Sequence, residues 1–451
     1  MEAAAAQTAG DFFEPFEQVQ PNAIQIAQNA FLKDERSTDP SLPANQRKHG
    51  LAQGFLLTNK VYEGMVDPQG DPINQKPGPL YLMGAIQEAE SRRLERRKEN
   101  PDLRRYQSPG EKLLLEIEAL AKEVIFGNKD PEALKKILTV PTMGMALSFA
   151  QVFQLLQKGH PDLKTVVLGT NGYGGYKSVL DENFETTIKY RQGTENNEFD
   201  MDSFRETIEG LKDPKNTLLL LQADAYNYTG VNPTSEQKQE IVEILKKHGV
   251  VTLVDSAYQG LIRNLDDDVE IARLLAESGL PFVVYDSYSK KAGIYGDRVS
   301  FVHFATGSEE QAKILKSNVY KQLRDKALAV PRTFELVYDL LTDETLKQKW
   351  IEELETAQQI LYTTKVKMAE ALGEGFEYIH PDHTQGMFNK FNISHEGGQV
   401  LADKYGIFVV NQKDEDTGEQ SLRVNMGAIP EQDIEYIAAS IKEVYNEYRT
   451  D

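Results

Sequence analysis

The segment VVYDSYSKKAGIYGDRVSF (283–301) joins the pattern of a buried strand to a loop of reactive side chains. The apolar run from Phe282 to Tyr285 is typical of a short strand that is buried on both faces. Serines, two lysines, glycines and one arginine follow it directly. Ligands in open α/β sheets bind at the carboxyl ends of the strands. This segment therefore predicts an α/β fold with a site just after the strand.

The rest of the central sequence alternates apolar runs with segments of helical period. Residues 234–249 predict a helix that begins after Thr234 as its N-cap and ends at Gly249. Strands that alternate with helices predict a mostly parallel sheet with helices on both faces. The expected strands are 164–169, 217–222, 250–255, 281–286 and 299–304.

The composition excludes several classes of function. The chain has 451 residues, 40% of them hydrophobic and 27% charged, which is typical of a globular protein with two or three domains. Its net charge of -20 disfavours nucleic acid as a partner. It has no cysteine, so disulfides, thiolate catalysis and Cys-ligated metals are excluded, and we expect no metal site. We expect no membrane span and no secretory signal, and therefore a cytoplasmic location.

Polar and aromatic side chains follow four of the predicted strands. They comprise one amine, one carboxylate, two phenols, an amide and a hydroxyl, and no histidine. An amine among such groups favours carbonyl chemistry in which the lysine forms a Schiff base. These residues are Tyr173, Asn227, Asp255, Tyr258, Ser287 and Lys290.

Three motifs together resemble the pyridoxal-phosphate-dependent aminotransferases of fold type I, in the aspartate and aromatic class. They are S-x-S-K-x-x-G-x-x-G-x-R (287–298), D-x-A-Y (255–258) and Y-N-Y-T-G-V-N-P-T (226–234). The resemblance extends over most of the chain, with further similar segments at 20–34, 385–394 and 421–429.

This resemblance implies a two-domain architecture. The large domain would hold the cofactor on a mostly parallel, seven-stranded type of sheet with helices on both faces, and the smaller domain would be α+β. The implied boundaries are 1–77 for an N-terminal arm and part of the small domain, 78–345 for the large domain and 346–451 for the C-terminal small domain.

The resemblance also implies the catalytic residues. Lys290 would bind pyridoxal phosphate as an imine and shuttle the substrate proton. Asp255 would pair with the pyridinium nitrogen. Tyr258 and Asn227 would hydrogen-bond the phenolate oxygen of the ring.

Further residues would hold the cofactor. Ser287 and Arg298 would bind its phosphate, and the guanidinium fork of Arg298 suits such an oxyanion. Tyr173 would stack on the pyridine ring.

A loop at 140–148 is expected to lead into a helix and to contact the phosphate. Thr142, Met143 and Gly144 are the residues that the resemblance places there. Met143 departs from the family pattern, because small residues usually occupy this loop.

The substrate and a partner subunit are the last elements that the resemblance implies. Arg423 would bind the α-carboxylate, and Asn227 and Lys60 would lie near the substrate. Tyr106 would reach the phosphate of the neighbouring subunit, which predicts a homodimer with shared active sites. A second arginine for a distal carboxylate has no clear position, and Arg332 is the nearest candidate.

The predicted function is transamination between an α-amino acid and a 2-oxo acid. Aromatic, broad-range and aspartate-like donors are all compatible with the sequence, with a lean toward the first two. A pyridoxal-phosphate-dependent lyase or decarboxylase is an alternative, as is a non-catalytic protein that senses the cofactor or an amino acid. The basic run at 91–105 is interpreted as a solvated helix face or a dimer contact.

Overall fold

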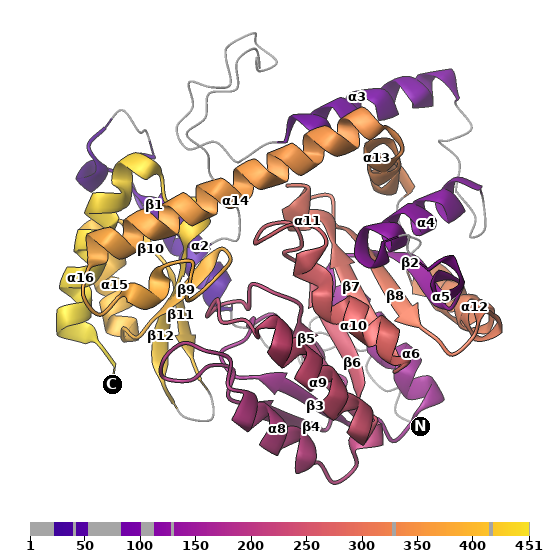
Figure 1. Cartoon of the computed structure of the whole chain (residues 1–451). Helices are drawn as coiled ribbons and strands as arrows, with labels where there is room; N and C mark the ends of the chain where they lie inside the picture. The colour runs from indigo at the N-terminus through magenta and orange to yellow at the C-terminus, as the bar shows by residue number, and fades with distance from the viewer. Residues whose placement is uncertain are drawn as a thin grey trace, which may run out of the picture.

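A seven-stranded sheet forms the centre of the larger domain (Figure 1). The computed structural model describes residues 22–38, 42–52, 83–100, 112–127, 130–326, 331–414 and 418–450. β8 runs antiparallel to both of its neighbours and the other adjacent strands are parallel, so the predicted mostly parallel sheet is confirmed. In spatial order the strands are β2 (Ile137–Met143), β8 (Val299–Ala305), β7 (Phe282–Ser287), β6 (Val251–Ser256), β5 (Thr217–Gln222), β3 (Thr165–Gly169) and β4 (Thr186–Tyr190).

Helices cover both faces of this sheet because its strands are apolar on both sides. In β5, Leu218 and Leu220 pack in one buried cluster and Leu219 and Leu221 in another, on opposite faces. The first face is covered by α6 (Met145–Gly159), α7 (Tyr176–Asp181) and α12 (Glu309–Lys326), and the second by α8 (Met201–Glu209), α9 (Ser235–His248) and α10 (Glu270–Ser278).

Two strands of the sheet, β2 and β4, have no counterpart among the predicted strands. Both are edge strands. β2 contains Pro141, a residue that sheets accept at their edges, and β4 is the polar sequence TTIKY. Neither sequence shows the long apolar run that marked the central strands.

The smaller domain is built around a three-stranded antiparallel sheet. Its strands are β11 (Val410–Lys413), β12 (Gln420–Asn425) and β9 (Phe388–Phe391), and α15 (His395–Tyr405) and α16 (Ile434–Tyr448) pack on it. The long helix α14 (Glu344–Leu372) runs from the larger domain into this one (Figure 1). The N-terminal segment joins it through α2 (Ala23–Lys33) and β1 (His49–Gly50), which pairs with β10 (Ile407–Phe408).

The remaining helices pack beside the sheet and around α14. They are α3 (Gly84–Glu99), α4 (Lys112–Phe126), α5 (Pro131–Lys135), α11 (Tyr288–Lys291) and α13 (Pro331–Thr342). No helix in the described part of the chain is long and apolar enough to cross a membrane.

The basic run on α3 forms ion pairs within the chain. Arg96 lies 2.7 Å from a carboxylate oxygen of Asp339, and Arg97 lies 2.5 Å from one of Glu335, both on α13. The interpretation of this run as a solvated face is therefore wrong for these two arginines, and the alternative of a dimer contact stays a prediction. Their charges hold α3 against α13.

Candidate active site

One cavity of about 510 Å³ lies between the two domains at the carboxyl ends of the central strands. The larger domain contributes most of its wall, α2 contributes Ile24 and Gln28, and the smaller domain contributes Phe388 and Arg423. Eight of the predicted site residues line it: Tyr173, Asn227, Asp255, Tyr258, Ser287, Lys290, Arg298 and Arg423.

Lys290 lies on the short helix α11, directly after β7, and faces this cavity. Its Nζ lies 4.4 Å from the centre of the Tyr295 ring. Burial lowers the pKa of Lys290 to about 7, and the positive charges of Arg423 and Arg298 act in the same direction. A large fraction of its amine is therefore neutral and nucleophilic near neutral pH.

The neighbouring Lys291 points away from the cavity into the protein. It is fully buried, and its Nζ donates to a carboxylate oxygen of Asp286 and, at 2.7 Å, to Oε1 of Gln259. The indole nitrogen of Trp350 donates to its carbonyl oxygen at 2.7 Å. These contacts commit Lys291 to a buried ion pair, so the geometry favours Lys290 as the reactive lysine.

Asp255 lines the cavity, and its two carboxylate oxygens differ in their contacts among the described residues. Its Oδ2 accepts a hydrogen bond from the hydroxyl of Tyr176, while Oδ1 is buried and has no hydrogen-bond partner among the described residues. Burial raises the pKa of Asp255 to about 6, and the bond from Tyr176 opposes that rise. A buried anionic oxygen without a partner is suited to a cationic N–H donor on a ligand.

The side chain of Asn227 forms hydrogen bonds with both Tyr258 and Arg423. Its Nδ2 donates to Tyr258 Oη at 3.1 Å, and its Oδ1 accepts from Arg423 Nη1 at 3.2 Å. Burial raises the pKa of the Tyr258 hydroxyl, which therefore keeps its hydrogen as a donor. Arg423 also donates to the carbonyl oxygen of Ala52 at 2.7 Å, and its guanidinium lies 4.4 Å from the centre of the Phe388 ring.

The loop at the start of α6 lies against Arg298. A Cβ atom on Gly144 would lie 2.1 Å from Nη2 of Arg298. The backbone φ of Gly144 is +70°, a value that is strained for residues other than glycine. The Gly144 N–H donates to Ser300 Oγ at 2.9 Å, and Thr142 Oγ1 lies 3.1 Å from the same oxygen. Met143 ends β2, so this segment is a strand up to Gly144 rather than the expected loop.

These contacts bear on the predicted phosphate loop. Among the described residues that line the cavity, Thr142, Met143 and Gly144 are absent. Met145 is the residue of this segment that lines it. Gly144 still shapes the site, because it leaves room for the Arg298 guanidinium beside the first turn of α6.

Some functional candidates were missed from the sequence. Tyr176, the hydrogen-bond partner of Asp255, was not predicted, although it lies three residues after Tyr173 in the same glycine-rich segment.

Lys60 and Tyr106 lie outside the described residues. Arg332 lies in α13, and its proposed role stays a prediction.

The residues present fit pyridoxal phosphate. Lys290 provides an amine of lowered pKa, and the unpartnered Oδ1 of Asp255 provides an acceptor for a protonated ring nitrogen. The Gly144 position leaves space for a guanidinium that suits a phosphate group. Tyr173 and Tyr258 add aromatic surface to the same cavity.

Comparison with known proteins gives the same assignment. The sequence model of the family "Aminotransferase class I and II" matches residues 85–441. The chain belongs to this family. It is a pyridoxal-phosphate-dependent aminotransferase, as the three motifs predicted.

Relatives within the family include enzymes with different donors. The chloroplastic aspartate aminotransferase of Arabidopsis thaliana is 26% identical over 387 residues, which cover 81% of this chain and 79% of the relative. The aromatic-amino-acid aminotransferase of Escherichia coli is 24% identical over 365 residues, which cover 76% of this chain and 88% of the relative.

Solved structures of aminotransferases share the fold. The aspartate aminotransferase from the cytoplasm of Saccharomyces cerevisiae superposes with a TM-score of 0.80 at 22% identity, covering 98% of this chain and 100% of that one. An aromatic-amino-acid aminotransferase from Burkholderia pseudomallei, covalently bound to pyridoxal phosphate, superposes with a TM-score of 0.78 at 20% identity, covering 96% and 99%.

Proposed function

We propose that this aminotransferase works in the cavity between its two domains, with Lys290 as the residue that binds pyridoxal phosphate covalently. The observation that carries the proposal is the arrangement of Lys290, Asp255, Arg298 and Arg423 around one cavity of about 510 Å³. An amine, a ring-nitrogen acceptor and two anion-binding forks are the groups that amino transfer requires.

Each side chain then has a defined task. Pyridoxal phosphate, when bound, supplies a carbonyl that condenses with amines and a ring that accepts electrons. Lys290 Nζ moves the proton that leaves the substrate Cα, and Asp255 keeps the ring nitrogen protonated. Tyr258 donates its hydroxyl hydrogen to the phenolate oxygen of the ring.

Arg423 is the proposed binding residue for the substrate α-carboxylate. It is buried beside Asn227 and the carbonyl oxygen of Ala52, which fix its plane with one hydrogen bond from each Nη. A guanidinium has five N–H donors, so it retains others for a carboxylate. Donors without an α-carboxylate, such as simple amines, are therefore expected to react poorly.

The side chain of the amino donor meets a largely neutral wall. Among the described residues that line the cavity, the cationic ones are Lys290, Arg298 and Arg423, and each already has a proposed role. Tyr173, Phe388 and the α2 residue Ile24 offer apolar and aromatic surface. This lining supports an aromatic or broad-range donor, because burial of apolar area favours it by about 25 cal/mol per Å².

A single-turnover scan of donors tests the proposal. The cofactor-loaded enzyme is mixed with one amino acid at a time, and the loss of its visible absorption is followed. Phenylalanine and tyrosine are expected to react at least as fast as aspartate and glutamate. Much faster reaction with the acidic donors would contradict the donor class, and no reaction with any α-amino acid would contradict the assigned site.

A homodimer in the cytoplasm completes the proposed function. The family resemblance of the segment around Tyr106 supports shared active sites between two subunits. Sedimentation at micromolar concentration should show a dimer without an active monomer. Cell fractionation tests the compartment.

A further inference from the structure

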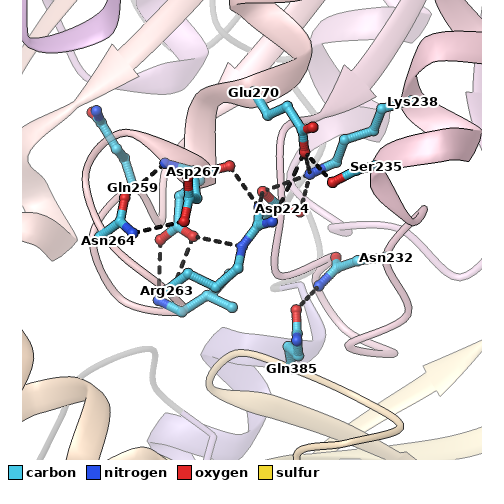
Figure 2. A network of polar contacts seen from close by, with 12 residues as sticks. Asp224, Asn232, Ser235, Lys238, Gln259, Arg263, Asn264, Asp267, Glu270 and Gln385 are labelled. Atoms are coloured by element: carbon cyan, nitrogen blue, oxygen red, sulfur yellow. Dashed lines mark hydrogen bonds and ion pairs between the residues drawn. The ribbon is translucent and has the colours of Figure 1, made fainter.

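A network of buried and partly exposed charges connects the two loops that carry Asn227 and Tyr258 (Figure 2). Asn227 follows β5 and Tyr258 follows β6, and their side chains meet in the active site at 3.1 Å. That distance depends on how the two loops are held relative to each other. The network lies away from the cavity, and none of its charged residues lines it.

The first loop is fixed by Asp224, three residues before Asn227. Its carboxylate is buried and accepts from Lys238 Nζ at 3.0 and 3.1 Å. Lys238 projects from α9 and is itself 1% exposed. Glu270 of α10 shares this lysine at 3.3 Å.

The second loop is fixed by Asp268, which acts on backbone groups just after Tyr258. Its Oδ2 accepts from the N–H groups of Gly260 at 2.9 Å and Ile262 at 3.1 Å. Its Oδ1 accepts from the N–H of Arg263 at 3.0 Å. One buried carboxylate therefore sets the course of residues 260–263.

Arg263 joins the two halves. Its Nη2 donates to Asp224 Oδ2 at 2.7 Å and to the carbonyl oxygen of Asp267 at 2.6 Å. Its Nε lies 3.4 Å from Asp268 Oδ1. In Figure 2 the Arg263 guanidinium lies between the Asp224 side and the Asp267 side of the network. Only a planar fork with several N–H donors makes these contacts at once.

We propose that Arg263 is a positioning residue that fixes the Asn227 and Tyr258 loops relative to each other. The proposal rests on the roles given above to Asn227 and Tyr258. Loss of the Arg263 fork leaves Asp224 and Asp268 without their shared cation, so the loops separate slightly. The Tyr258 hydroxyl then donates a weaker hydrogen bond to the cofactor. Residues that support a contacting side chain in this way control its geometry without touching the ligand.

The test measures the cofactor environment in Arg263→Met and Arg263→Lys. The readout is the pH midpoint of the visible absorption of the loaded enzyme, together with kcat/KM and Tm. With a weaker hydrogen bond from Tyr258, the phenolate oxygen of the cofactor would accept more strongly from the N–H of the protonated imine. The protonated imine would therefore be favoured. We expect Arg263→Met to raise the midpoint by about 0.5–1 unit and to lower kcat/KM about tenfold. Arg263→Lys keeps the charge without the fork and should show about half of this effect.

A matched control and a double variant separate positioning from general damage. Arg205→Met removes a partly exposed arginine with two acidic partners, Asp202 and Glu240, and should leave the midpoint unchanged. Tyr258→Phe removes the hydroxyl through which Arg263 is proposed to act. Adding Arg263→Met to Tyr258→Phe should therefore shift the midpoint no further.

The outcomes are distinct. An unchanged midpoint in folded Arg263→Met, or an additive shift in the double variant, overturns the proposal and leaves the proposed function intact. If Arg263→Met does not fold, a midpoint in Arg263→Lys equal to that of the wild type overturns it. A wild-type protein that shows no visible absorption with pyridoxal phosphate contradicts the proposed function instead.

Discussion

The hydroxyl of Tyr176 donates a hydrogen bond to Asp255 Oδ2 and leaves Oδ1 of the same carboxylate without a partner among the described residues. The two residues are 79 positions apart and both are buried. Tyr176 stacks nearly parallel to Phe149 and meets Tyr173 edge-on, so its position is set by aromatic packing. This arrangement leaves one oxygen of a carboxylate in the cavity lining available to a ligand.

Replacement of Tyr176 by Phe tests that arrangement. Loss of the bond removes a contact that favours the ionised carboxylate, so the pKa of Asp255 should rise further above its ordinary value. We expect turnover to fall about tenfold and the acid limb of the pH profile to move to higher pH. Asp255→Ala should lower turnover on the order of 10²-fold or more.

Tyr190→Phe is the matched control for this prediction. The Tyr190 hydroxyl is also buried, but it has no hydrogen-bond partner within the described residues and lies away from the cavity. Its removal should leave the pH profile unchanged. An equal change in the two variants would contradict a specific role for Tyr176.

Lys290 should carry the cofactor, and Lys291 should not. Borohydride reduction of the loaded enzyme is expected to fix the label on Lys290, and Lys290→Ala should lose the visible absorption. Lys291→Met should lower the free energy of unfolding by about 3 kcal/mol or more, because it leaves Asp286 as a buried charge without its cation. Peptide mapping that placed the label on Lys291 would contradict the assignment.

The rate at which apoenzyme takes up pyridoxal phosphate should depend on pH through Lys290. Only the neutral amine attacks the aldehyde, and burial with two nearby arginines lowers the pKa of this lysine to about 7. The rate should therefore increase from about pH 6 to about pH 8 and then level off. A rate that continued to increase toward pH 10 would mean that Lys290 has the pKa of an ordinary lysine. Stopped-flow absorbance makes the measurement.

Gly144→Ala should weaken cofactor binding through Arg298. The added methyl group would overlap the guanidinium, and the positive φ of Gly144 adds strain. We expect the Kd for pyridoxal phosphate to rise about tenfold or more, as measured by equilibrium dialysis. Gly144 precedes the first turn of α6, and Gly159 lies in the last turn of that helix. A Cβ atom on Gly159 would meet no atom within 4 Å among the described residues, so Gly159→Ala should leave the Kd unchanged.

The sequence by itself predicted the elements whose signals are local. The segment 283–301 predicted a strand followed by a lysine loop; the structure has the strand, β7, but one helical turn, α11, carries the lysines in place of the loop. The helix after Thr234 forms with a complete capping box and ends at Gly249 in the left-handed conformation. Side-chain period, capping residues and glycine geometry act over a few residues, so they can be recognised without tertiary contacts.

Tertiary structure decided the contacts between distant parts of the chain. The motif in the sequence singled out Lys290, but only the tertiary structure shows that Asp286, Gln259 and Trp350 hold the adjacent Lys291 in the core. The Tyr176–Asp255 bond likewise joins the start of α7 to β6, and the Asp224–Arg263 bond joins the loops that follow β5 and β6. Such pairs form only when the sheet brings its strand ends together, and that depends on the packing of the whole core.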